Sequence, residues 1–317
     1  MKRILYIDIL KLFTIFLVLW GHAIMHFQPD FGKSYIFQTI YAFHMPLFMM
    51  LSGYFAVSSL ELSARDFFTK KFRQLILPCI SWGVICWLVI TSGLIEGRFH
   101  LELKSLFTGW LGLIDNFWFL KSCFICYTLT WLSWRTGRYK IIAFVVVWVL
   151  CTMQGRFFLS TMFPSFLLGI YLRKNELMKE WLSSFWYIPF IVFLVFLSYK
   201  LYTMDEVPYA LKLILGASGS LSFYAIFKSV FEHCPPTSVI TFGAKLGGAT
   251  LGIYILDVII FAVIIPRYVS FDSFPMYSII MMMPLISAAL LLLFYSITSV
   301  ISKSKKLAWL LLGHGLS

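Results

Sequence analysis

The sequence predicts an all-α, polytopic membrane protein with about ten transmembrane helices and both termini in the cytoplasm. Its composition is the first observation: 60% of the 317 residues are hydrophobic and 13% are charged, which is far from the usual composition of soluble proteins. Separate apolar runs also approach or exceed the ~20 residues that cross a bilayer as a helix. Finally, Lys and Arg gather in alternate loops on the side that holds the N-terminus, and this bias indicates the cytoplasmic side.

The apolar runs define ten expected spans, which are 4–25, 35–57, 75–95, 117–134, 140–153, 157–172, 183–201, 209–230, 248–265 and 277–300. An even number of spans keeps the basic loops on one side of the membrane. We expect a single transmembrane domain over residues 1–317 with no attached soluble domain. The net charge of +12 belongs to loops that orient the chain, so the lipid bilayer is an expected partner and nucleic acid is not.

The first span carries three polar residues, Asp8, Lys11 and His22, that a plain membrane anchor would not need. At 3.6 residues per turn all three lie on one face of a helix. An ionisable side chain inside a bilayer is costly unless it is paired or faces a wet cavity, so such residues mark a functional interior. Asp8 and Lys11 can neutralise each other, and a simple orientation anchor is the alternative for that pair. For His22 the alternative is a packing histidine.

The second span, 35–57, places His44 and Pro46 inside the membrane, followed by Gly53. Pro46 and Gly53 can break this helix, which a bilayer tolerates where the freed backbone groups face protein or a cavity. His44 is a candidate for the wall of a substrate site, with helix packing as the alternative.

The fourth span opens with Asn116 and Trp118 at about the height of His22. Both are candidates for contacting a substrate, and an interfacial aromatic belt is the alternative for Trp118. The loop before this span, 95–116, is the longest expected on the outer side, and its polar residues can frame a substrate mouth. The C-x-x-C pair within the span lies on a helix, which favours packing thiols, and we expect no metal site.

Four stretches resemble acyltransferase family 3, a family of bacterial inner-membrane enzymes that acetylate or otherwise acylate surface carbohydrates. They are residues 6–11 with 21–22, 43–48 with 52–55, 73–78, and 117–120. The resemblance implies that His22 is the essential catalytic histidine and that Lys11 is the basic residue required with it. Family members often carry a histidine at the place of Asp257, so the role of that position stays open.

The reaction that the resemblance implies is the transfer of an acetyl or other short acyl group from cytoplasmic acetyl-CoA to a hydroxyl of a cell-surface polysaccharide or lipid-linked sugar. A base must take the hydroxyl proton, and neutral imidazole suits that task. We assign it to His22, with Lys11 on the donor's route and tuned by Asp8. A covalent acyl-histidine is the alternative to direct transfer, and the sugar, its hydroxyl and the acyl group are open.

Binding of the acyl-CoA co-substrate needs cations for its phosphates, and a basic cluster stands at the cytoplasmic start of the third span. Arg73 is the natural candidate because a guanidinium pairs bidentately with phosphate. Lys70 and Lys71 either assist it or only set the topology. Two other classes compete with the enzyme: a transporter or flippase for a glycan, and a subunit of a polysaccharide export complex. Polysaccharide-synthesis proteins are possible partners in any of these cases.

Overall fold

The computed structural model describes residues 4–28, 30–91, 115–154, 158–204, 207–265 and 276–313, without the side chains of 89–91, 262–263 and 276–281. All regular structure in these ranges is helical, with no strand. The outer loop 95–116 lies outside the described residues except for its last two positions.

The first half of the chain forms α1 (Leu5–Phe27), η1 (Phe31–Lys33), α2 (Tyr35–Ala56), η2 (Val57–Ser59), α3 (Ala64–Lys71), η3 (Phe72–Ile76), α4 (Leu77–Thr91), α6 (Trp118–Arg135), η4 (Gly137–Tyr139) and α7 (Lys140–Gln154). The second half forms α8 (Leu159–Lys174), α9 (Glu176–Ser184), α10 (Tyr187–Thr203), α11 (Tyr209–Phe231), α12 (Ser238–Gly248), α13 (Thr250–Val258), η6 (Ile259–Ile264), α15 (Met276–Lys303) and α16 (Lys305–Leu312).

Each of the ten predicted ranges overlaps one of these helices. By length and apolarity alone, five helices among the described residues can cross a membrane, or up to seven if each of two bent helix pairs forms one span. Glu176–Ser184 and Tyr187–Thr203 meet at 71°, and Ser238–Gly248 meets Thr250–Phe261 at 58°. The chain is therefore an all-α, multi-pass membrane protein.

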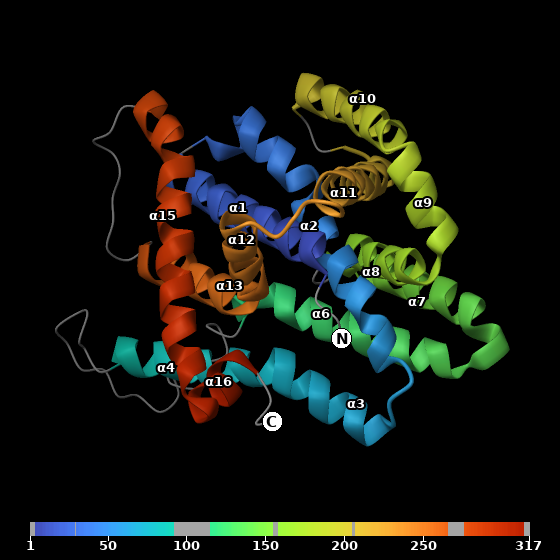
Figure 1. Cartoon of the computed structure of the whole chain (residues 1–317), viewed down its shortest axis with the longest axis horizontal. Coiled ribbons are helices and arrows are strands. Elements are labelled where there is room, and N and C mark those ends of the chain that lie inside the picture. The colour runs from blue at the N-terminus through green and yellow to red at the C-terminus, as the bar shows by residue number, and fades with distance from the viewer. Residues whose placement is uncertain are drawn as a thin grey trace.

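Helices α1 and α2 cross the centre of the molecule, with α15 along one side and α7 to α10 toward the other (Figure 1). α1 packs against α2, α11, α12 and α15, and α2 packs against α8 and α11. α1 and α2 run antiparallel, because Gly21 near the end of α1 contacts Tyr41 near the start of α2, while Lys11 lies over Phe55 near the end of α2. This central pair carries Asp8, Lys11, His22 and His44.

The break that Pro46 and Gly53 can cause does not occur, because α2 runs through both residues. Gly53 serves close packing instead of bending: a Cβ there would collide with the carbonyl oxygen of Phe166, and a Cβ on Gly169 would collide with that of Met50. Small residues of this kind let two membrane helices approach closely. α8, α1 and α11 hold α2 from several sides, so the helix continues past the proline.

Candidate functional site

The polar stripe predicted on α1 faces the protein interior. Asp8 and the apolar residues Ile15 and Val18 between the polar ones are buried. The side chains of Lys11 and His22 are 22% and 20% exposed. The shared face derived from the helical period is therefore confirmed.

His22 meets a carboxylate from the far end of the sequence. Its Nδ1 lies 2.6 Å from Oδ2 of Asp257, whose side chain is fully buried. The sequence left the role of Asp257 open, and the structure makes it the partner of His22. An imidazole that bonds a carboxylate through Nδ1 is fixed in orientation and keeps Nε2 for a second partner.

The helix that carries Asp257 changes its geometry directly after that residue. α13 ends at Val258, and η6 continues as a π-helical turn. Such turns are frequent at functional sites. Phe261 in this turn lies against the rings of His22 and His26, at centroid distances of 6.2 and 5.7 Å.

One oxygen of the buried carboxylate has no hydrogen-bond partner in the part of the chain that the structure describes. Oδ1 of Asp257 is buried and unpaired among the described residues, as is the hydroxyl of Tyr254 one turn earlier on the same helix. An unpaired buried polar group is costly and calls for an explanation. A ligand group that bonds these atoms would supply one.

The other two members of the stripe form a separate pair. Lys11 Nζ lies 3.2 Å from Asp8 Oδ1 and 4.3 Å from the centre of the Phe55 ring. Eleven residues of helix separate Lys11 from His22, which is about 16 Å at 1.5 Å per residue. The structure therefore brings Asp8 to Lys11, and His22 to Asp257, at two levels of one helix face.

A cavity of about 310 Å³, here called the Gln74 cavity, begins at Val18, one helical turn before His22 on α1. Its lining includes Val18, Met45, Gln74, Cys123, Tyr254 and Gly313. Val18 precedes His22 by one turn on α1, and Tyr254 precedes Asp257 by one turn on α13. The cavity therefore extends from Gln74 and Gly313 up to the residues that support the His22–Asp257 pair.

The predicted basic cluster lies beside this cavity. Arg73 stands in the π-helical turn η3 next to Gln74, and its Nε is buried without a hydrogen-bond partner in the described part of the chain. Lys71 is buried, with Nζ 3.6 Å from the centre of the Tyr127 ring and 3.5 Å from Gln74 Oε1. This burial lowers the pKa of Lys71 to about 8. Lys70 is half-buried on the last turn of α3.

A second cavity, of about 510 Å³ and here called the Lys200 cavity, lies at the His22 end of α1. Its lining includes Gln38, Tyr41, Met45, Trp118, Lys200 and Lys212. Trp118, which we predicted to contact a substrate, lies in the wall of this cavity. Met45 lines both cavities.

The other two predicted substrate residues occupy different positions. His44 is buried behind Tyr41, with ring centroids 4.6 Å apart, and its Nδ1 donates to the carbonyl of Ile40 at 2.8 Å. It supports the cavity wall instead of forming it. Asn116 is half-buried just before α6, and it is not part of the lining of either cavity.

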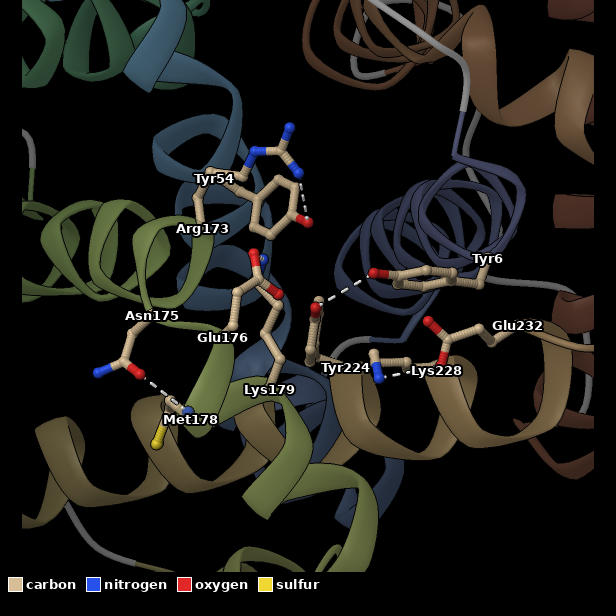
Figure 2. Close-up of polar contacts among 10 residues, drawn as sticks. All are labelled: Tyr6, Tyr54, Arg173, Asn175, Glu176, Met178, Lys179, Tyr224, Lys228 and Glu232. Atoms are coloured by element: carbon tan, nitrogen blue, oxygen red, sulfur yellow. Dashed lines mark hydrogen bonds and ion pairs between the residues drawn. The ribbon is translucent and has the colours of Figure 1, made fainter.

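The Asp8 end of α1 borders a group of charged and phenolic side chains, which we call the tyrosine cluster (Figure 2). Its members are Tyr6, Tyr54, Tyr224, Arg173, Lys179, Lys228, Glu176 and Glu232. Within it, Tyr6 bonds Tyr224 at 3.2 Å and Arg173 donates to the Tyr54 hydroxyl at 3.1 Å. Two lysines pair with acids, Lys179 with Glu176 at 2.6 Å and Lys228 with Glu232 at 2.9 Å.

These features define a multi-pass membrane protein that holds a histidine–carboxylate pair beside two cavities. Among the described residues, no group of three or more His, Cys, Asp or Glu side chains suits a metal ion. Residues 4–302 match the family described as an acyltransferase domain. The chain therefore belongs to acyltransferase family 3.

Two curated relatives bear the name nodulation protein NolL. The protein of Mesorhizobium japonicum is 33% identical over 140 residues, which are 40% of this chain and 35% of the relative. The protein of Sinorhizobium fredii is 31% identical over 151 residues, which are 45% of this chain and 38% of the relative. The match thus spans little more than a third of each relative. No solved structure matches the chain at a significant level.

Proposed function

We propose that the protein is an acyl-CoA-dependent O-acyltransferase of the bacterial inner membrane, which moves an acetyl or other short acyl group to a carbohydrate hydroxyl. The observation that carries the proposal is the 2.6 Å contact between His22 and Asp257, in a chain that belongs to an acyltransferase family. In the topology we propose, the ten predicted ranges are spans, both termini are cytoplasmic, and the Asp8 end of α1 is the inner end. The basic loop residues support this orientation.

The chemistry begins with the proton of the acceptor hydroxyl. With Nδ1–H donated to Asp257, Nε2 of His22 is free to take that proton while the hydroxyl oxygen attacks the carbonyl carbon of the thioester. The carboxylate stabilises the imidazolium that forms. The tetrahedral intermediate then expels the CoA thiolate, which receives the proton from Nε2, so His22 returns to its neutral form.

The donor would enter through the Gln74 cavity. Its mainly apolar wall suits the long pantetheine arm of CoA, and its upper end at Val18 and Tyr254 is one turn from the His22–Asp257 pair. Arg73 stands beside Gln74 at the other end of the cavity, and its buried Nε has no hydrogen-bond partner within the described ranges. A phosphate oxygen would satisfy that donor in a charge-assisted hydrogen bond. We propose that Lys11 and its partner Asp8 are positioning residues on this route. Lys70 and Lys71 would add positive charge near the phosphates.

The acceptor would occupy the Lys200 cavity, across Met45 from the donor. Tyr41 and Trp118 offer aromatic faces there, and His44 holds Tyr41 in place. Asn116 stands next to α6 at the same end of the molecule and is proposed to contact the acceptor from outside the cavity.

The test is release of free CoA from acetyl-CoA by the purified protein in nanodiscs, with envelope glycans supplied as acceptors. We expect His22→Ala to lower the rate by about 10²–10⁴, the usual contribution of a general base. His26→Ala is the matched control, since His26 lies one turn further on α1 and stacks on the same Phe261 ring. Native protein that releases no CoA, or a His22→Ala variant as active as the control, would contradict the proposal.

A further inference from the structure

The side chain of Tyr254 lies in the wall of the Gln74 cavity and comes from α13. It is 7% exposed and belongs to the cavity lining. Its ring packs edge-on against the ring of Phe119, with centroids 5.8 Å apart, which restrains its direction. Three residues later the same face of α13 carries Asp257, the partner of His22. Tyr254 therefore stands at the end of the cavity where the proposed donor would present its thioester.

The hydroxyl of Tyr254 is a hydrogen-bond donor that the described residues leave unused. Its oxygen is buried, and none of these residues forms a hydrogen bond with it. The hydroxyl of a buried tyrosine usually finds a partner, because a buried polar group left unpaired is costly. The hydroxyl of Tyr224, which is also buried, bonds Tyr6 at 3.2 Å. A ligand oxygen in the cavity would give Tyr254 the partner that Tyr224 already has.

The first turn of α6 faces the same end of the cavity. α6 begins at Trp118, and its N-cap residue is Phe117, whose side chain cannot bond the backbone N–H groups of that turn. Phe119 and Leu120 of this turn line the cavity. The backbone of Phe119 lies near the Tyr254 hydroxyl without forming a hydrogen bond to it. Because a helix N-terminus carries partial positive charge, it favours a negatively charged oxygen beside this hydroxyl.

We propose that the Tyr254 hydroxyl donates a hydrogen bond to the thioester carbonyl oxygen of the acyl donor and stabilises the oxyanion that forms there. The inference rests on the proposed function, because it adds a catalytic residue to the same reaction. When the acceptor oxygen bonds to the carbonyl carbon, the π electron pair of the C=O bond moves onto the carbonyl oxygen. Tyr254 keeps its own proton throughout. The electron pair returns to the C=O bond as the C–S bond breaks and the CoA thiolate leaves.

This assignment places the two requirements of acyl transfer on one helix. Asp257 orients the imidazole that takes the proton, and Tyr254 holds the oxygen that takes the charge. The two residues are separated by about 4.5 Å along α13 at 1.5 Å per residue, so the base and the oxyanion donor have a fixed spacing. Stabilisation of the oxyanion by a preorganised donor is usually the largest single electrostatic contribution to such a reaction.

The first measurement is binding, by calorimetry with the protein in nanodiscs, of two unreactive analogues of acetyl-CoA. In one analogue a methylene group replaces the thioester sulfur, which leaves a ketone in place of the thioester carbonyl. In the other analogue that carbonyl is also reduced to a methylene group. We expect the native protein to bind the ketone about two- to tenfold more tightly, which is the range for one hydrogen bond. Tyr254→Phe should abolish this preference and bind the reduced analogue with native affinity.

The second measurement is kcat for CoA release, together with thermal unfolding of the same samples. We expect Tyr254→Phe to lower kcat by about 10²–10³, the usual loss when one oxyanion donor is removed. It should not unfold earlier, since no described residue bonds the hydroxyl. Tyr224→Phe is the matched control: it should unfold earlier because Tyr6 loses its partner, while its kcat per folded molecule and its preference for the ketone stay native.

Three results would overturn the inference. The first is equal binding of the two analogues by the native protein. The second is a Tyr254→Phe variant that keeps either native kcat or the native preference for the ketone. The third is a Tyr254→Phe variant that unfolds as early as Tyr224→Phe, because that result would show that the hydroxyl has a structural partner.

The His22→Ala variant separates this inference from the proposed function. It should release CoA about 10²–10⁴-fold more slowly and still prefer the ketone, because Tyr254 is intact. If the preference depends on Tyr254 but the native protein shows no His22-dependent release, the carbonyl site stands and the proposed function fails. If release depends on His22 but Tyr254→Phe keeps native kcat, the proposed function stands and the role of Tyr254 fails.

Discussion

The tyrosine cluster and the Lys200 cavity lie at opposite ends of α2, and each contains at least one lysine that is partly or fully buried. In the cluster, the fold itself supplies the partners: Lys228 bonds both Glu232 and Ser183. In the cavity, Lys200 meets a main-chain carbonyl. Asp257 Oδ1 and Arg73 Nε have no hydrogen-bond partner among the described residues.

This difference separates groups that hold the helices together from groups that are completed by a ligand. The cluster joins α1, α2, α8, α9 and α11 (Figure 2), so its substitution should lower stability more than activity. The incompletely bonded groups lie beside the two cavities, so their substitution should lower activity more than stability. The four predictions below test that division.

Asp257→Asn is expected to give the largest effect. An amide carries no charge to stabilise the imidazolium, and its NH2 group can donate to Nδ1 of His22 and so hold the wrong tautomer. We therefore expect kcat to fall by about 10²–10⁴. The measurement is the steady-state rate of CoA release over a range of acetyl-CoA concentrations, with thermal unfolding of the same sample. A variant that unfolds early but keeps native kcat would place Asp257 among the structural groups.

Arg73→Gln is expected to act on donor binding. Loss of a charged hydrogen bond to phosphate should raise KM for acetyl-CoA about ten- to a hundredfold, with kcat within about twofold because no reacting atom is touched. Arg65→Gln is the matched control, since Arg65 is exposed on α3. If KM does not change in the Arg73 variant, the phosphate assignment is wrong.

Lys228→Met tests the structural side of the comparison. The change removes the partner of Glu232 and the bond to Ser183, and we expect a loss of about 1–3 kcal/mol in stability. Differential scanning fluorimetry in detergent measures it, with the exposed Lys303→Met as control. Per folded molecule, kcat and both KM values should stay native; a selective rise in KM would instead give the cluster a role in binding.

Lys71 gives the smallest expected effect, and it depends on pH. Burial lowers its pKa from the usual 10.5 to about 8. Between these values the unfolded chain binds the proton and the folded chain does not, so stability rises with pH across this window. Relative to Lys71→Met, the native protein should therefore gain a few degrees in Tm from about pH 8 to pH 10. A constant difference between the two proteins across this range would show that the ammonium group is not buried at a cost.

The part of the site that the sequence predicts is the part set by one helix. Asp8, Lys11 and His22 share a face of α1 because the helical period alone determines it. The apolar ranges likewise indicate where helices form, since length and hydrophobicity are local properties. The resemblance to acyltransferase family 3 is confirmed by a match that covers residues 4–302.

The rest depends on which helices pack together. Asp257 is 235 residues from His22, and no local pattern pairs them, although an acid inside an apolar run was a signal that it has a partner. The break that Pro46 can cause does not occur, because α1, α8 and α11 hold α2 along its length. The 58° bend between α12 and α13 also depends on how the helices pack, and so does the position of Met45 in the walls of both cavities.

Met45 has a consequence for the membrane itself. Elsewhere the hydrocarbon layer keeps the two aqueous compartments about 30 Å apart. If donor and acceptor occupy the two cavities as proposed, both molecules touch the thioether side chain of Met45, which belongs to the barrier between them. An acyl group could then leave the cell interior while its carrier stays behind. The same side chain would have to prevent a leak of ions and protons whenever both cavities stand empty.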